Sequence, residues 1–212
     1  MKREGTVLMH RTMTALGIAA ALWIAAGLQG GELGRAAGQV RTPDVVYVGT
    51  PYDVVSRMLK MARITDKDVV YDLGCGDGRM VVLAAKKYGC RGRGVDIDPE
   101  RVGAALSNVV RNGVAKLVKI TEADLYALDL SGADVLVLYL LPDINRKLVP
   151  KFEKLKPGVR LVFHDYGLEG FEADQSVRVT SNEDGAAHTL FLYTTPLKPN
   201  FGDRLLNLET PE

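Results

Sequence analysis

The feature that most constrains this chain is a glycine-rich turn between an apolar segment and a helical pattern. Residues 69–78 read VVYDLGCGDG, and residues 79–88 continue with the apolar spacing of a helix. Glycines at alternate positions permit positive φ angles and a close approach of the backbone to a ligand. A helix that begins at Arg79 points the positive end of its dipole into the same space. The turn therefore predicts an anionic or polar ligand that meets bare backbone N–H groups.

The spacing of the glycines and of two acids narrows the ligand. A dinucleotide-binding turn reads G-x-G-x-x-G, whereas Gly74, Gly76 and Gly78 follow G-x-G-x-G. Asp72 lies two residues before the first glycine, and Asp96 ends the next apolar segment. In such folds a ribose-binding carboxylate follows the first motif by about twenty residues. The pattern does not require a pyrophosphate; the alternative is an ordinary βα turn followed by a surface acid.

Two motifs carry a family resemblance. DLGCGDG at residues 72–78 and GVDIDP at residues 94–99 resemble the cofactor motifs of the class I S-adenosylmethionine (SAM) dependent methyltransferases. In that family the glycines and the first acid hold the methionine part of SAM, and the second acid takes both ribose hydroxyls. An acid in the position of Asp124 meets the adenine amino group. The resemblance implies an enzyme with SAM as its cofactor.

Strand and helix patterns alternate along most of the chain. Apolar segments predict strands at residues 69–74, 91–97, 117–121, 133–141 and 160–165, and helical spacing predicts helices at residues 50–64, 79–88, 99–113 and 144–155. This alternation predicts an open parallel sheet wound on both faces. Thr50 is expected to cap the first helix, with Pro51 at its first position.

The pattern changes near the C-terminus. Strands expected at residues 177–181 and 189–195 flank turn residues at 182–185, which predicts an antiparallel hairpin. The fold class is therefore α/β, and the resemblance implies a doubly wound, Rossmann-like seven-stranded methyltransferase sheet closed by this hairpin. The chain after Pro196 is expected to be poorly ordered.

Ligands of open α/β sheets bind beyond the carboxyl ends of the strands. These ends, the two motifs and the region before the first helix give the candidate cofactor-binding residues, which are Asp72, Gly74, Cys75, Gly76, Gly78, Asp96, Ile97, Asp124, Leu125, Tyr139, Tyr47 and Thr50. Two of them have plain alternatives. Asp124 is equally a loop or capping carboxylate, and Thr50 is equally only a helix cap.

A closer resemblance bears on the methyl acceptor. From YVGTP at residues 47–51 to HD at residues 164–165, the chain resembles protein lysine methyltransferases of the mitochondrial membrane-associated type and their bacterial relatives. In those enzymes the first of these segments folds over SAM and substrate, which implies contacts from Tyr47 and Thr50. A protein lysine is therefore the expected acceptor. Two alternatives stay open: a small-molecule O- or N-methyltransferase, and a non-catalytic, membrane-tethered SAM-binding protein.

Composition excludes several other classes. The net charge is +1, from 27 basic and 26 acidic residues, and no basic run is interleaved with aromatics, so a general nucleic-acid binder is not indicated. Two cysteines, Cys75 and Cys90, do not make a disulfide framework. The three histidines are scattered along the sequence without the spacing of metal ligands, so no metal is expected.

The N-terminus has a different composition. Residues 12–31 contain no charged residue, and three basic residues precede them. This predicts a signal peptide or a membrane anchor, and length does not decide between the two. The expected organisation is an apolar segment and linker at residues 1–38, a methyltransferase domain at residues 39–200 and a tail at residues 201–212. Because SAM is a cytoplasmic metabolite, we expect a membrane-associated protein with a cytoplasmic catalytic domain; export is the alternative.

Overall fold

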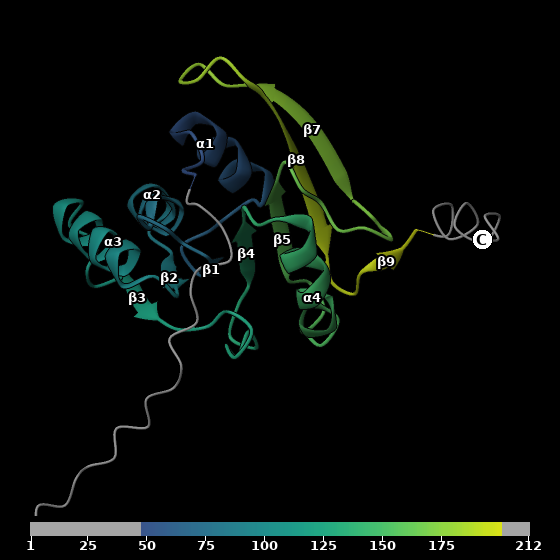
Figure 1. Cartoon of the computed structure of the whole chain (residues 1–212), viewed down its shortest axis with the longest axis horizontal. Helices are drawn as coiled ribbons and strands as arrows, with labels where there is room; N and C mark the ends of the chain where they lie inside the picture. The colour runs from purple at the N-terminus through teal and green to yellow at the C-terminus, as the bar shows by residue number, and fades with distance from the viewer. Residues whose placement is uncertain (1–47, 201–212) are drawn as a thin grey trace, which may run out of the picture. The chain divides into compact units, whose positions relative to one another are not determined.

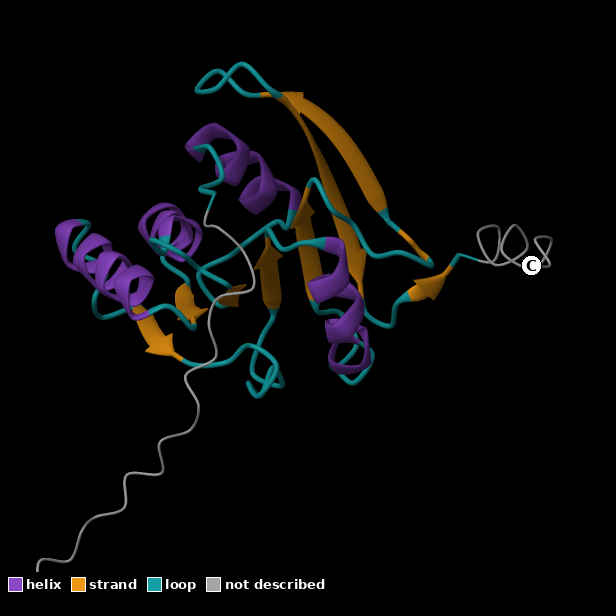
Figure 2. Cartoon of the chain, in the orientation of Figure 1, coloured by secondary structure: helices purple, strands orange, loops and turns teal. Residues whose placement is uncertain are grey.

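Helices and strands alternate through most of residues 48–200, the part of the chain that the computed structural model describes (Figures 1 and 2). The helices are α1 (Tyr52–Met61), α2 (Arg79–Tyr88), α3 (Pro99–Arg111) and α4 (Pro142–Phe152). The strands are β1 (Val69–Leu73), β2 (Arg91–Asp96), β3 (Val118–Glu122), β4 (Val135–Leu138), β5 (Arg160–His164), β6 (Phe171–Glu172), β7 (Gln175–Thr180), β8 (Ala187–Thr194) and β9 (Lys198–Pro199). The apolar segment at residues 12–31, Tyr47 and the tail at residues 201–212 lie outside this part.

Seven of the described strands form one sheet in the order β3-β2-β1-β4-β5-β8-β7. Strands β1 to β5 pair in parallel, and β8 pairs antiparallel with both β5 and β7. The predicted α/β class, the doubly wound sheet and the C-terminal hairpin are confirmed. The expectation of poor order after Pro196 is wrong for Lys198 and Pro199, which form β9 and pair with β6; residues 201–212 lie outside the described part.

Strand β4 shows why the sheet is covered on both faces. All four of its residues are fully buried, as expected for a central parallel strand. Val135 and Val137 belong to a core that includes residues of α1, α2 and α3. Leu136 and Leu138 belong to the opposite core, which includes residues of α4. The period of two along one strand therefore separates the two layers of helices.

The start of α1 differs from the prediction. The N-cap position is occupied by Pro51 and not by Thr50. The Pro51 side chain makes no capping hydrogen bond. The backbone N–H groups of Tyr52 and Asp53 instead donate to the carboxylate of Glu183, each at 3.0 Å. Glu183 lies in the loop between β7 and β8, which passes close to α1 in Figure 1. The carboxylate of Glu183, which is distant in sequence, therefore caps α1 in place of the predicted Thr50 hydroxyl.

Asp53 ties the same loop to α1 from the other side. Its carboxylate accepts from the backbone N–H of Asn182 at 2.7 Å and from the hydroxyl of Ser181 at 3.0 Å. The hydrogen bond from Asn182, which is the largest effect, lowers the pKa of Asp53. Each partner thus supplies acceptors for the other's backbone donors, and the loop and the helix start hold one another in place.

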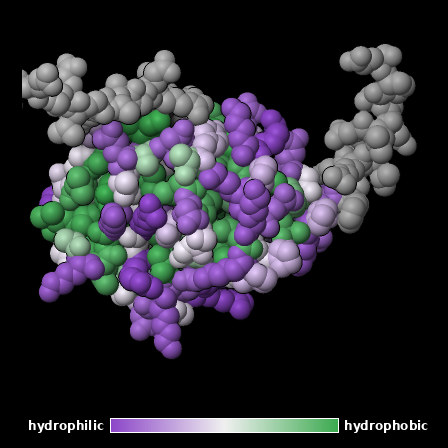
Figure 3. Space-filling view, turned by 90° about the horizontal axis from the view of Figure 1, so that it is seen from below, coloured by the Kyte–Doolittle hydropathy of each residue, from purple (hydrophilic) through white to green (hydrophobic). Residues whose placement is uncertain are grey.

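The surface of the domain carries some exposed apolar side chains. Leu106 and Val110 of α3 are 47% and 71% exposed. Figure 3 shows hydrophobic and hydrophilic residues interspersed over one face, with hydrophobic residues most concentrated toward the left. Among the described helices, none combines the length and the apolar composition needed to cross a membrane.

The reciprocal capping of α1 is testable by removing its carboxylate. We expect Glu183→Ala to lower the free energy of unfolding by about 1 kcal/mol, because two N–H groups of the first turn lose a charged acceptor. Urea denaturation followed by far-UV circular dichroism measures the change. Glu153→Ala, which removes an exposed glutamate at the other end of a different helix, serves as control and should change stability by less than about 0.5 kcal/mol. Equal effects of the two substitutions would contradict the cap.

Candidate functional site

The glycine turn after β1 is folded onto the end of β2. Its three glycines adopt positive φ angles, 72° at Gly74, 54° at Gly76 and 72° at Gly78. The N–H groups of Gly74 and Cys75 both donate to the carbonyl of Val95, at 2.8 and 2.9 Å. The N–H of Gly78 donates to the carbonyl of Cys75 at 2.8 Å. Glycine is needed here because other residues rarely adopt these backbone angles.

Asp96 completes this closure with its side chain. Its Oδ2 accepts from the N–H of Gly76 at 2.8 Å, and its Oδ1 accepts from the N–H of Asp98 at 3.0 Å. The expectation that the turn presents bare N–H groups to a ligand is therefore wrong for Gly74, Cys75, Gly76 and Gly78, whose amides bond within the protein. Each carboxylate oxygen keeps a second lone pair. The turn thus positions an acceptor, and the site is suited to hydroxyl or amino donors.

Asp72 is the second carboxyl group of this site. It lies on β1, is 2% exposed, and its Oδ2 has no hydrogen-bond partner among the described residues. Burial, and then the negative charges of Asp96 and Asp77, raise the pKa of Asp72 well above its usual value. A buried carboxyl oxygen without a partner is costly. A cationic or hydrogen-donating ligand would remove that cost.

Arg79 connects the turn to the segment before α1. Its guanidinium forms an ion pair with Asp77 at 2.8 Å and donates to the carbonyl of Thr50 at 2.9 Å. The same group lies 5.0 Å from the ring centre of Tyr52. Sequence reasoning treated Arg79 only as a helix residue. Its position directly after the last glycine was the available signal.

The end of β3 brings the predicted adenine-side residues near Asp96. The N–H of Ala123 donates to the carbonyl of Asp96 at 2.9 Å, so the following loop starts beside the end of β2. Asp124 accepts from the N–H of Tyr126 at 2.8 Å, which is the turn geometry that the plain alternative predicted. Ile97 and Leu125 are partly buried in these loops. The structure therefore gathers the candidates of β1, β2 and β3 at one edge of the sheet.

A second group of polar residues lies at the ends of β4 and β5. The Thr50 hydroxyl is 3.0 Å from Nδ1 of His164, and both side chains are buried. The ring of Tyr139 lies 4.0 Å from that of His164, centre to centre, and stacks on Tyr166 at 6.3 Å. Thr50 and Tyr139 are thus placed here by contacts with His164. Tyr47 lies outside the described residues, and its expected contact stays a prediction.

Two histidines that the sequence separates meet in this group. Nε2 of His164 lies 2.9 Å from Nδ1 of His188, which lies 3.1 Å from Oδ2 of Asp165. Nε2 of His188 lies 3.2 Å from a carboxylate oxygen of Asp184. These histidines are scattered along the sequence, but the pairing of strands β5 and β8 brings two of them together in space.

The two histidines differ in charge preference. Burial lowers the pKa of His164 to about 4, although Asp165 acts in the opposite direction. Burial also disfavours the cation of His188, but hydrogen bonds to Asp165 and Asp184 outweigh it and raise the pKa of His188. Asp165 itself has a positive φ of 59°, an unusual value for aspartate, and its Oδ1 accepts from the N–H of Thr189 at 2.8 Å. Strained backbone of this kind is common at functional sites.

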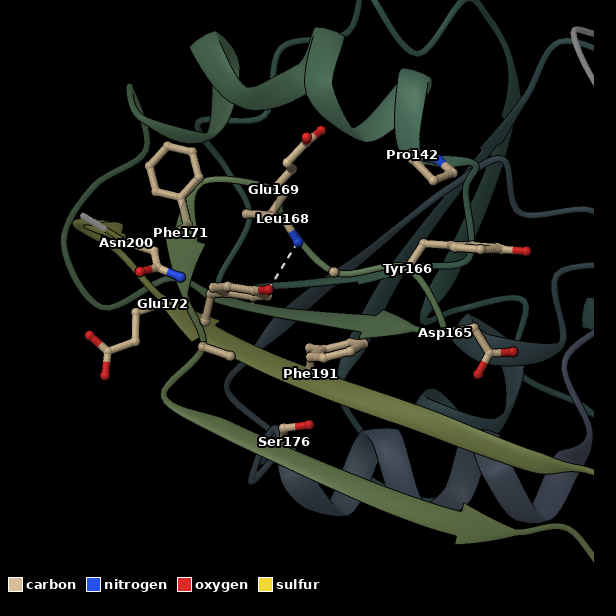
Figure 4. Close-up of a pocket in the computed structure, with 13 residues that line it drawn as sticks. Pro142, Asp165, Tyr166, Leu168, Glu169, Phe171, Glu172, Ser176, Phe191 and Asn200 are labelled. Atoms are coloured by element: carbon tan, nitrogen blue, oxygen red, sulfur yellow. Dashed lines mark hydrogen bonds between the residues drawn. The ribbon is translucent and has the colours of Figure 1, made fainter. Parts of the chain in front are cut away.

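A pocket of about 570 Å³ opens beside this group. Figure 4 shows Tyr166 and Phe191 near the middle of the lining, with Asp165 at one end and Glu172 at the other. The phenol oxygen of Tyr193 accepts from the N–H of Leu168 at 2.9 Å and fixes the loop over it (dashed line in Figure 4). The full lining is Pro142, Asp165, Tyr166, Gly167, Leu168, Glu169, Phe171, Glu172, Ala173, Ser176, Phe191, Tyr193 and Asn200. Aromatic and other apolar side chains form most of its surface, three acids contribute to the lining, and these residues include no lysine or arginine.

With this geometry in view, comparisons with known proteins identify the family. A model described as the ANTKMT methyltransferase domain matches residues 72–175. A protein-lysine N-methyltransferase of Saccharolobus islandicus is 43% identical over 154 residues, which are 71% of this chain and 94% of that protein. A ribosomal protein L11 methyltransferase of Pectobacterium carotovorum is 36% identical over 108 residues, and this match covers 35% of that enzyme.

Solved structures agree with the fold. An RNA methyltransferase from Salinibacter ruber, determined in complex with S-adenosyl-L-homocysteine, is 44% identical to this chain with a TM-score of 0.65. The match covers 70% of this chain and 94% of that one. The cofactor of this enzyme is accordingly SAM, as the glycine turn and its acids predicted. The chain belongs to the ANTKMT-type protein-lysine methyltransferase family of the class I SAM-dependent methyltransferases.

Proposed function

We propose that this enzyme transfers the methyl group of SAM to the ε-amino group of a lysine in a protein. The observation that carries the proposal is the match with the lysine enzyme of Saccharolobus islandicus, which extends over almost all of that protein. The relative from Salinibacter ruber is described as an RNA methyltransferase at nearly the same identity. The two relatives therefore differ in the acceptor that their names give, and the residues that line the pocket of this chain favour one of the two acceptors.

The charge of the pocket favours a cationic acceptor over nucleic acid. Asp165, Glu169 and Glu172 line it, and its lining contains no lysine or arginine. Glu169 is paired with Arg146 at 2.9 Å and Asp165 with His188 at 3.1 Å, so Glu172 is the acid of this lining that has no ion pair in the described part of the chain. A phosphate backbone would be repelled, because proteins bind it through lysine and arginine. A lysine would be attracted, and aromatic walls suit its aliphatic stem and charged end.

The cofactor side has the chemistry that SAM requires. SAM supplies a methyl group already activated on a sulfonium, and it carries a cationic amino group and a ribose diol. We propose that Asp96 accepts from the ribose hydroxyls, since its oxygens keep free lone pairs, and that Asp72, whose buried Oδ2 lacks a partner, faces the cationic part. The other proposed cofactor contacts come from the glycine turn and from Asp124, Ile97, Leu125, Tyr139 and Thr50.

The remaining work of the protein is placement and removal of a proton. Methyl transfer needs the acceptor in line with the donor and shielded from water. A free lysine has a pKa of about 10.4, so its amine must lose a proton before it reacts. The buried residues Thr50 and His164 and the partly buried Tyr139 lie together at the ends of β4 and β5, where contact with water is small. The acidic pocket attracts the ammonium form, and this group of residues favours the neutral amine.

Asp96 provides the direct test of the cofactor site. We expect Asp96→Ala in the full chain to weaken binding of S-adenosyl-L-homocysteine about 100-fold, since charged hydrogen bonds to hydroxyls are lost. Isothermal titration calorimetry measures this affinity. Glu122→Ala is the matched control, because Glu122 pairs in register with Asp96 at the exposed end of β3 and should leave the affinity unchanged. A folded Asp96→Ala protein with wild-type affinity would refute the assignment.

The acceptor class is tested by transfer of a labelled methyl group. Full-length enzyme is incubated with methyl-labelled SAM and host lysate, and label should appear in protease-sensitive, RNase-resistant material. Acid hydrolysis of that material should release methylated lysine. Label removed by RNase would favour the RNA reading, and label only in low-mass products would favour a small-molecule acceptor. A folded enzyme that binds SAM but transfers no label would support a non-catalytic role. Asp96→Ala serves as the background control.

A further inference from the structure

Three ligand-type atoms converge where β5 ends beside β8. They are Nε2 of His164, Nδ1 of His188 and Oδ2 of Asp165. The separations are 2.9 Å between the two nitrogens, 3.1 Å from His188 to Asp165, and 3.4 Å from His164 to Asp165. The three atoms therefore form a small triangle with nearly equal sides.

The size of this triangle fits a transition-metal ion. Metal–ligand bonds of about 2.0–2.2 Å in a tetrahedral Zn²⁺ site place neighbouring ligand atoms about 3.3 Å apart. The longest side matches that value, and the other two are shorter by a few tenths of an ångström. Two imidazoles and one carboxylate are a common ligand set for Zn²⁺ and its neighbours, whereas Mg²⁺ and Ca²⁺ prefer oxygen ligands alone.

The outer atoms of the three residues are held as in metal sites. The Thr50 hydroxyl lies 3.0 Å from Nδ1 of His164, and the Asp184 carboxylate lies 3.2 Å from Nε2 of His188. Metal-binding histidines usually give their second nitrogen to a carboxylate, hydroxyl or carbonyl group, which fixes the ring. The N–H of Thr189 fixes Asp165 in the same way. A hydrogen bond to the other polar atom of each side chain therefore fixes the orientation of all three proposed ligands.

The negative charge of the two carboxylates in this group also favours a bound cation. Asp165 and Asp184 are both carboxylates, and in the described part of the chain their ion pairs are with the two histidines alone. Neutral imidazoles leave this group with a net negative charge. A proton on His188 would offset one charge, and a divalent ion would offset both. The proton is therefore the competing occupant.

From these observations we infer that His164, His188 and Asp165 form a binding site for one divalent transition-metal ion of the Zn²⁺ class. Three protein ligands leave a fourth position open, as in metal sites that bind water or a substrate group. The Asp165 side chain is 27% exposed, and Asp165 also belongs to the lining of the pocket, so the proposed metal site adjoins that pocket. The inference does not depend on the identity of the methyl acceptor.

Cobalt binding tests the site directly. The full chain, expressed without a polyhistidine tag and stripped with a chelator, is titrated with Co²⁺ and then with Zn²⁺. We expect a visible d–d absorption band that saturates at one Co²⁺ per chain and is abolished by one equivalent of Zn²⁺. Absence of a saturable band in the wild-type protein overturns the inference and leaves a proton as the occupant.

Three variants separate this site from adventitious binding. His188→Gln removes a ligand and should abolish the band. Asp184→Asn keeps all three ligands but weakens the support of His188, so affinity should fall about 10- to 100-fold. Asp174→Asn is the matched control, because Asp174 pairs with Lys198 at 2.6 Å outside the cluster, and should bind as wild type. Unchanged Co²⁺ affinity in both His188→Gln and Asp184→Asn, with the fold intact by circular dichroism, would refute the site.

Discussion

The closure of the β1 turn onto β2 is the constraint on which the cofactor side depends. One carbonyl, that of Val95, accepts from two consecutive amides, and the carboxylate of the next residue accepts from a third. These bonds are possible only because the backbone reverses at glycines with positive φ. They engage the amides of Gly74, Cys75 and Gly76, while the oxygens of Asp96 each keep a lone pair for a further donor. A turn of this kind suits a cofactor with hydroxyl and cationic groups better than one with a pyrophosphate.

Arg79 extends this closure across the sheet. It pairs with Asp77 in the turn and donates to the carbonyl of Thr50, whose hydroxyl meets His164. A single chain of contacts therefore joins the turn after β1 to the end of β5. Through these contacts, the residues proposed to bind the cofactor and those proposed to receive the acceptor share one rigid support. A substitution at either end of this chain of contacts would therefore alter the position of the residues at the other end.

The sequence predicted those features that depend on local pattern. The period of apolar residues identified every strand of the large sheet to within a few positions, and the spacing of Gly74, Gly76 and Gly78 identified the turn after β1, where all three have positive φ. The features it missed depend on contacts between distant residues. Thr50 meets His164 across 114 positions, and Glu183 reaches Tyr52 across 131. No local pattern encodes such pairs, since the hydroxyl of Thr50 suits a helix cap equally well.

The meeting of His164 and His188 has the same origin. They are 24 positions apart, and only the antiparallel pairing of β8 with β5 places their rings together. The spacing rules for metal ligands describe residues on one turn or one helix, so they do not detect ligands on β5 and β8, between which the chain forms β6 and β7. Asp165 could be named from its strand end, but its left-handed backbone angle could not.

The capping of α1 by Glu183 also bears on how the protein is made. The first helix of the domain is synthesised early, yet the carboxylate that satisfies its first turn emerges from the ribosome about 130 residues later. Until then its N-terminal amides depend on water, and His164 is absent from the side of Thr50. Contacts between residues so far apart in sequence form late, because a long loop must close before they can be made. A nascent chain that has not yet reached the β7–β8 loop and β8 therefore lacks both the cap of α1 and the histidine that meets His164, although β1 to β5 are already synthesised.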